Sequence, residues 1–344
     1  MKKSKKLIIQ RISKVICFLL IFTIFLGVGS KIFIPKKNSA EYGNKNYYGN
    51  SYHGEAKDSI DILVLGNSSA YKSFSPLELW NKYGYTSFVC GAPAQKIQEG
   101  YYMLEDFLKE QKPKIVIYET EGIFNSYGRK INGSDPQAKR DLIFLSNEVD
   151  GVNATLDVVT ANLCPLLKNH NRWSSLKAED FTLTPDYSQH YVTKGYVFTK
   201  KVKPYKGNKN YMKPSDYTTP IQYTNTYYLD KMKNLCEENG AEFVLMSSPL
   251  PRAWNDERHK AVKGYADKNG LSYLDTNLHI KEMKINWSKD TSDKGYHLNV
   301  YGAKKNTLFV GKYLSERYEL TDHRNDTAYS QWDKDYKIYS KKFK

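Results

Sequence analysis

The chain has 344 residues, of which 40% are hydrophobic and 26% charged, and a net charge of +15. This apolar content excludes a disordered chain, the mean hydropathy of −0.65 excludes a polytopic membrane protein, and four cysteines exclude a disulfide-built scaffold. Nine of the cations and no acidic residue lie in residues 1–37, which leaves +6 of the +15 for the rest. That mild excess, without zinc-ligand spacing or an RNA-binding aromatic signature, argues against nucleic-acid binding.

An apolar segment near the N-terminus predicts a membrane anchor. Val15–Ser30 contains no charge, and Leu7–Ile34 is long enough to cross a bilayer if Lys14 and Lys31 reach the two interfaces. Six cations precede the segment and three follow it, so the positive-inside rule places the N-terminus in the cytoplasm and the main domain outside. A cleaved signal peptide is the alternative, although Gly27-Val28-Gly29 is a poor cleavage site. The Lys-, Asn- and Tyr-rich composition is typical of a Gram-positive surface protein.

Short apolar strands then alternate with helices. Residues 38–58 are polar and are interpreted as a linker. The expected elements that follow it are strand 60–66, helix 76–82, strand 86–90, helix 96–110, strand 115–118, helix 227–239, strand 242–246, helix 256–269, strand 271–274 and helix 303–320. Ser75 and Glu78 form a capping-box pattern before the first helix. This order predicts an α/β domain over residues 59–320, with a doubly wound parallel sheet.

Three other regions fall outside this alternation. Residues 125–220 are expected to form an insertion, with one helix-like stretch at 138–145, and residues 321–344 a polar tail on the surface. Cys17 lies in the anchor, so Cys90, Cys164 and Cys236 allow one disulfide whose members the sequence does not name.

Candidate catalytic residues lie directly after strands of this sheet, where ligands bind in open α/β folds. Ser68 follows the first strand in Gly66-Asn67-Ser68, and Gly91 ends the second. His297, with Asp293 four residues earlier, precedes the last helix. A serine nucleophile needs a base held in one tautomer by a third group, and the N–H groups of Ser68 and Gly91 can face a developing oxyanion.

These motifs resemble the SGNH/GDSL hydrolase superfamily. The stretches GNSSAYKSFSP, GAPAQ, QKPKIVIYE and YHLNVYGAKK resemble its membrane-anchored branch, which includes the teichoic-acid D-alanyl transfer protein and alginate-type O-acetyltransferases. The resemblance covers about residues 58–124 and 224–320. It implies a flavodoxin-like strand order, Ser68 as nucleophile, His297 as general base, Asp293 as its orienting acid, and an MBOAT-type acyl-exporting membrane protein as partner.

The sequence departs from the family pattern at two places. The family spaces its acid and base as D-x-x-H, whereas Asp293 and His297 are separated by three residues, so Asp290 is an alternative acid. The family's G-x-N-D block, whose Asn donates to the oxyanion, is replaced by Glu119-Thr120-Glu121-Gly122. Gln95 or a residue of the insertion is then the expected third donor.

Further residues are candidates for binding the substrate. His170, Arg172 and Trp173 suit an anionic or sugar ligand, although an insertion folding around its own Trp explains them equally well. Asn299 is a further candidate, with a structural role in its loop as the alternative. No metal or nucleotide motif is present in the sequence, so no cofactor is expected.

Three functions follow from these observations. The leading hypothesis is a membrane-anchored extracytoplasmic acyltransferase or esterase that acts on O-acyl groups of a cell-surface polysaccharide or teichoic-acid-like anionic polymer. The second is a simple carbohydrate or lipid ester hydrolase. The third is a non-catalytic SGNH-like scaffold of a cell-envelope acylation complex, which the missing G-x-N-D block favours.

Overall fold

The computed structural model describes residues 2–42, 47–124, 166, 169–182 and 184–343. The chain divides into two compact units. One comprises Met1–Lys45 with Arg140–Tyr187, and the other comprises Asn46–Lys139 with Ser188–Lys344. The expected helical stretch at 138–145, and Cys164, lie outside the described residues. Each unit is described by itself below.

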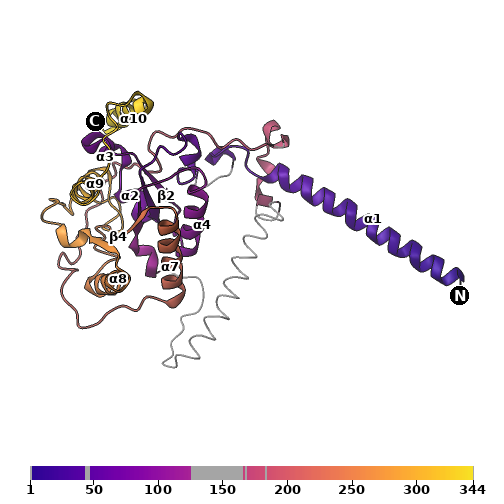
Figure 1. The fold of residues 1–344 in the computed structure, drawn as a ribbon, viewed down its shortest axis with the longest axis horizontal. Helices are drawn as coiled ribbons and strands as arrows, with labels where there is room; N and C mark the ends of the chain where they lie inside the picture. The colour runs from indigo at the N-terminus through magenta and orange to yellow at the C-terminus, as the bar shows by residue number, and fades with distance from the viewer. Residues whose placement is uncertain (1, 43–46, 125–165, 167–168, 183, 344) are drawn as a thin grey trace. The chain divides into compact units, whose positions relative to one another are not determined.

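The larger unit is built on a five-stranded parallel sheet (Figure 1). The strands are β1 (Ile62–Gly66), β2 (Ser87–Gly91), β3 (Ile115–Glu119), β4 (Glu242–Ser247) and β5 (Ser272–Asp275). Their order is β2-β1-β3-β4-β5, and every pair is parallel. The expected α/β class with a doubly wound parallel sheet is therefore confirmed. The carboxyl ends of β1 and β3, next to each other in the sheet, form the edge that carries the candidate site.

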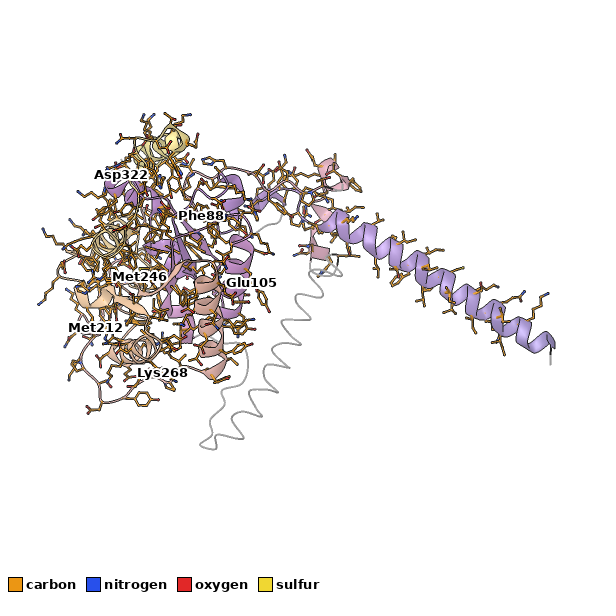
Figure 2. All side chains as sticks on the ribbon, in the orientation of Figure 1. Phe88, Glu105, Met212, Met246, Lys268 and Asp322 are labelled. Atoms are coloured by element: carbon orange, nitrogen blue, oxygen red, sulfur yellow. The ribbon has the colours of Figure 1, made fainter. Side chains whose placement is uncertain are left out.

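Helices cover both faces of the sheet because successive strand residues point to opposite sides. Leu63 and Leu65 of β1 pack in a cluster with α4 (Ile97–Phe107), α7 (Tyr223–Glu238) and α8 (Asp256–Asn269). Ile62 and Val64 pack with α2 (Ser68–Ser73), α3 (Pro76–Tyr83) and α9 (Val300–Ser315) on the other face. Figure 2 shows the resulting dense layer of side chains around the labelled Phe88 of β2 and Met246 of β4, which are both buried.

The C-terminal tail differs from the expectation of a polar surface segment. It contains α10 (Ser330–Phe343), and the side chains of Trp332 and Tyr339 on this helix are 3% and 1% exposed. Both belong to a cluster with Trp80 of α3 and Val300 of α9. Trp332 and Tyr339 stand seven residues apart, which places them on one face of a helix.

Two local expectations also require correction. Ser75 precedes α3, but its side chain makes no capping bond; its Oγ donates to the Tyr339 hydroxyl at 3.1 Å. Glu78 pairs with Lys304 at 3.0 Å instead of completing a capping box. The expected cap residue, Ser75, is thus bonded to Tyr339 of α10, a helix that the local sequence pattern does not reveal. Cys90 and Cys236 are buried free thiols.

The smaller unit begins with α1 (Lys2–Phe33). Residues Lys6–Phe33 of this helix are long and apolar enough to cross a membrane, with a mean hydropathy of 2.4 in their most apolar window. The short helices η1 (Ala40–Tyr42), η4 (His170–Ser174) and η5 (Ala178–Phe181) belong to the same unit. The sheet unit has four more such turns, which are η2 (Ser51–Gly54), η3 (Thr120–Phe124), η6 (Thr276–His279) and η7 (Thr327–Tyr329).

Candidate active site

The turn between β1 and α2 presents Ser68 at the carboxyl edge of the sheet. Gly66 has a φ of +149°, and a Cβ there would lie 2.9 Å from the Cβ of Glu119 and 3.0 Å from that of Ala70. Only glycine fits this conformation and this space. Asn67 then caps α2 by accepting the N–H of Ser69 at 2.9 Å, so Ser68 opens the helix. The sequence Gly-Asn-Ser is thus a turn that fixes the position of a serine hydroxyl.

Ser68, His297 and Asp293 form a continuous hydrogen-bonded chain. The Ser68 Oγ lies 2.7 Å from Nε2 of His297, although 229 residues separate them in sequence. Nδ1 of the same ring contacts Oδ2 of Asp293, and the His297 backbone N–H donates to Oδ1 of Asp293 at 2.7 Å. The Asp293 carboxylate therefore holds both the backbone and the ring of His297. The structure brings together the three residues expected from the sequence as nucleophile, base and acid.

The loop that carries His297 contains three residues between Asp293 and His297, and its backbone brings these two side chains together. Lys294 and Gly295 both have left-handed backbones, with φ of 67° and 96°. These two residues turn the chain so that His297 folds back over Asp293. Thr291 Oγ1 donates to the His297 carbonyl at 3.0 Å and accepts the Gly295 N–H at 2.8 Å, which closes the loop.

Asp290 has a different role in this loop. Its Oδ2 pairs with Lys305 Nζ at 2.6 Å and accepts the N–H of Asn286 at 2.6 Å. Its side chain is 2% exposed, and these contacts anchor the loop to α9. Of the two acids that the sequence leaves open, Asp293 is the one in contact with His297.

Asp293 is suited to stay ionised beside His297. Burial by itself would raise the pKa of this carboxyl, but its hydrogen bonds to His297 and its electrostatic interactions with His297 and Lys72 lower it below its usual value. An ionised Asp293 accepts the Nδ1 proton, which leaves Nε2 with a lone pair for the Ser68 hydroxyl. This is the tautomer that a general base requires.

Gly91 lies beside the turn that carries Ser68, and Tyr71 follows Ser68 on α2. A Cβ on Gly91 would be 2.7 Å from the Gly66 carbonyl oxygen and 3.0 Å from Cδ1 of Tyr71, so the bare Cα of Gly91 packs against this ring. The Tyr71 side chain is 5% exposed, and its hydroxyl interacts with Tyr48 and Ser68. Burial raises the pKa of Tyr71, so its hydroxyl stays protonated and can donate. Sequence reasoning missed Tyr71, although its place three residues after Ser68 on a helix was a usable signal.

Gln95 lies in a different arrangement from the one expected. It is 1% exposed, its Oε1 accepts the N–H of Ala92 at 3.1 Å, and its Nε2 lies 2.9 Å from the Met103 sulfur. Both ends of the Gln95 amide are therefore used within the segment after β2, and neither is directed to an oxyanion.

Two glutamates, Glu119 at the end of β3 and Glu121 two residues later, support the turn that carries Ser68. Asn67 Nδ2 donates to the carboxylate of Glu121, and the Glu121 N–H donates to Oε2 of Glu119 at 3.2 Å. Oε1 of Glu119 accepts the N–H of Ser248 at 3.1 Å. Ser248 Oγ contacts Ser73 Oγ at 2.6 Å, and Ser73 bonds back to the carbonyl of Ser69. This closed ring positions the turn that carries Ser68.

Glu119 makes this ring sensitive to pH. Its side chain is fully buried, and burial together with the nearby Glu121 raises its pKa from 4.5 to about 8. In the unfolded chain the same carboxyl ionises near its ordinary value. Between these two pH values the folded state holds the extra proton, so stability falls as pH rises.

We expect the variant Glu119→Gln to lack this dependence. The wild-type free energy of unfolding, measured relative to the variant by urea denaturation, should fall by up to about 1.4 kcal/mol per pH unit between pH 5 and 8. Glu316→Gln, at an exposed position on the same unit, should show no such slope. Parallel pH curves for wild type and Glu119→Gln would contradict the buried proton.

One of the remaining substrate-binding candidates, Asn299, has a structural role. Asn299 is fully buried; its Oδ1 accepts the Tyr301 N–H at 3.1 Å and its Nδ2 donates to the Lys289 carbonyl at 2.6 Å. It is the N-cap of α9 and stabilises the loop, which corrects its assignment as a substrate ligand. His170, Arg172 and Trp173 belong to η4 of the other unit.

One cavity of the described residues lies away from Ser68. Among the described residues, no group of three or more His, Cys, Asp or Glu side chains is placed to hold a metal. A cavity of about 480 Å³ lies beside β5, lined by residues such as His259, Leu278 and Phe309, and Ser68 is not among its lining residues.

Comparisons with known proteins give structural neighbours for this chain. No family model and no curated protein sequence matches it. It is similar to a GDSL-like lipase from Bacteroides thetaiotaomicron and to a protein of Bacteroides fragilis assigned to the acylhydrolases. Each is 12% identical with a TM-score of 0.36, over 79% of this chain and 100% and 95% of theirs, respectively.

Proposed function

We propose that this chain is a membrane-anchored, extracytoplasmic serine acyltransferase or esterase of the SGNH type. Its substrates are O-acyl groups of a cell-surface polysaccharide or a teichoic-acid-like polymer. The observation that carries the proposal is the hydrogen-bonded chain from Ser68 through His297 to Asp293. The α1 helix supports anchoring at the membrane, with the N-terminus in the cytoplasm of a Gram-positive cell.

The first half-reaction transfers an acyl group to Ser68. The Oγ attacks the acyl carbonyl while Nε2 of His297 takes its proton, and Asp293 stabilises the imidazolium that forms. The negative charge on the carbonyl oxygen is held by the N–H groups of Ser68 and Gly91, with the Tyr71 hydroxyl as a third donor. The intermediate collapses, the leaving oxygen receives the proton from Nε2, and an acyl ester on Ser68 remains.

The second half-reaction repeats these steps with an acceptor hydroxyl. Nε2 of His297 takes the acceptor's proton as its oxygen attacks the acyl-Ser68 carbonyl, and then returns the proton to Oγ as Ser68 leaves. A glycan or polyol hydroxyl makes the chain a transferase, with an MBOAT-type acyl-exporting protein as the partner that supplies the acyl group. Water as the acceptor makes it a hydrolase. The intact triad geometry counts against the third alternative, a non-catalytic scaffold.

The proposal is tested by replacing Ser68 with alanine in the full-length chain. We expect Ser68→Ala to reduce the ester-linked acyl content of the envelope polymer to the level of a deletion strain, because the acyl-enzyme cannot form. The acyl content is measured as acyl groups released by mild base, per unit of polymer. Ser69→Ala is the matched control, because the neighbouring residue contributes its backbone N–H to the Asn67 cap.

The same strains separate the two enzymatic alternatives. Acyl content that falls in Ser68→Ala supports transfer to the polymer, whereas acyl content that rises supports hydrolysis. Unchanged acyl content in Ser68→Ala, with protein present at the wild-type level, would overturn both.

A further inference from the structure

Two large aromatic side chains stand exposed in the unit that contains α1. Trp173 is 72% exposed and Phe181 is 62% exposed. They belong to η4 and η5, and we call these two short helices, His170–Ser174 and Ala178–Phe181, the collar. The other four tryptophans of the chain are at most 6% exposed, so Trp173 stands apart from them. These two exposed rings within one unit are therefore a candidate contact surface for an apolar partner.

Buried polar contacts fix the collar to the C-terminal end of α1. Nη1 of Arg172 donates to the Phe33 carbonyl at 2.6 Å, and Nη2 pairs with Asp180 at 2.8 Å. The side chains of Arg172 and Asp180 are 4% and 0% exposed. The last carbonyls of a helix lack partners within the helix, so Arg172 satisfies one of them while joining η4 to η5. This assigns Arg172 a structural role in place of the anionic-ligand role considered from the sequence.

The collar begins where the apolar surface of α1 ends. Apart from the half-buried Leu26, the large apolar side chains between Leu7 and Val28 are exposed, whereas Ser30 is 5% exposed. The stretch from Leu7 to Val28 is about 33 Å long at 1.5 Å per residue, close to the roughly 30 Å of a bilayer's hydrocarbon core. In Figure 1 the collar, drawn in pink, lies at the end of α1 opposite to the N label.

Charged groups at this end of α1 match the headgroup region of a bilayer. Lys36 donates to the Lys31 carbonyl at 2.7 Å, and Lys177 of the collar pairs with Glu41. Trp side chains are enriched at membrane interfaces, where the amphipathic indole ring lies at the level of the headgroups.

We infer that Trp173 and Phe181 insert into the lipid headgroup interface and that the collar fixes the depth of α1 in the outer leaflet. The inference rests on the proposed membrane anchoring and adds a second contact with the same bilayer. The partner of the two rings is a phospholipid surface. The rings lie close to it because Arg172 bonds the collar to the end of the spanning helix.

The test uses the full-length protein in phosphatidylcholine vesicles that contain lipids brominated at defined acyl positions. We expect the emission of Trp173 to be quenched most by lipids brominated near the headgroup. The quenchable part of the emission should disappear in Trp173→Phe, since the other tryptophans lie buried in the sheet unit. In the Trp173→Phe background, Phe181→Trp should restore shallow quenching, which reports on the second ring independently.

The alternatives give different outcomes. Trp173 that is quenched by aqueous acrylamide and not by brominated lipid would overturn the inference and favour the sugar-binding role. Trp173 protected from both quenchers would overturn it in favour of a protein partner. If the protein does not float with the vesicles, the proposed anchoring by α1 is wrong, and the inference about the two rings falls with it. The acyl content of the polymer in the Ser68→Ala strain tests the proposed activity without reference to Trp173.

Discussion

Replacing His297 with alanine is expected to slow the labelling of Ser68 by a fluorophosphonate by about 10²–10⁴-fold, the usual contribution of a positioned general base. The probe reacts with the Ser68 oxygen only as that oxygen loses its proton, and Nε2 at 2.7 Å is the group placed to take it. The rate is measured with the full-length protein in detergent, from the time course of probe incorporation. Wild-type labelling by the His297→Ala variant would exclude the base.

The two aspartates of the same loop give a sharp comparison. Asp293→Asn should slow labelling by a similar order, because an amide at this place favours the wrong tautomer of His297. Asp290→Asn should keep the labelling rate at low temperature and lower the melting temperature, since it weakens the ion pair with Lys305. A loss of labelling in Asp290→Asn alone would reverse the assignment of the triad acid.

Replacing Lys194 with methionine is expected to destabilise the sheet unit by about 3–5 kcal/mol, the cost of leaving buried charges uncompensated. The Lys194 side chain is fully buried, and its Nζ lies 2.8 Å from Glu55 and 2.8 Å from Asp335 of α10. Nζ also lies 4.6 Å from the centre of the Trp332 ring. This cluster joins the C-terminal helix to the rest of the unit. Thermal unfolding at pH 7 should show a melting temperature lower by on the order of 10 °C.

Acid should relieve this defect. Burial by itself would raise the pKa of Asp335, but its contacts with His190 and Lys194 lower it. Without Lys194 that carboxyl takes up a proton more easily, so the difference in stability should shrink as pH falls toward 4. Lys334→Met is the control, because Lys334 is an exposed cation on the same helix. An equal effect of both lysine variants would show that charge on α10, and not the buried cluster, is responsible.

Much of the fold follows from local sequence patterns. The strand 242–246 and the helix 256–269 were expected within one residue of the observed β4 and α8, because apolar periodicity and terminal glycines are local signals. The tail was misjudged for the opposite reason. The aromatic face of α10 is buried only because it packs against Trp80 and Tyr196, which lie far from it in sequence.

The candidate site divides in the same way. Gly66-Asn67-Ser68 and the acid and base before the last helix were readable because each is a short motif with its own chemistry. The ring from Asn67 through Glu121 and Glu119 to Ser248 was not readable, because its members come from the ends of three strands that only the folded sheet brings together.

The sequence by itself determined the α/β alternation, the apolar N-terminal segment and the serine after the first strand, since each depends on neighbouring residues. The tertiary structure placed Asp293, and not Asp290, in contact with His297. It also placed Tyr71 and Glu119 around the turn of Ser68, and it placed Arg172 at the end of α1. The physical reason is that hydrogen bonds and buried charges depend on distances of a few ångströms. Those distances are set by packing between segments that can be more than a hundred residues apart.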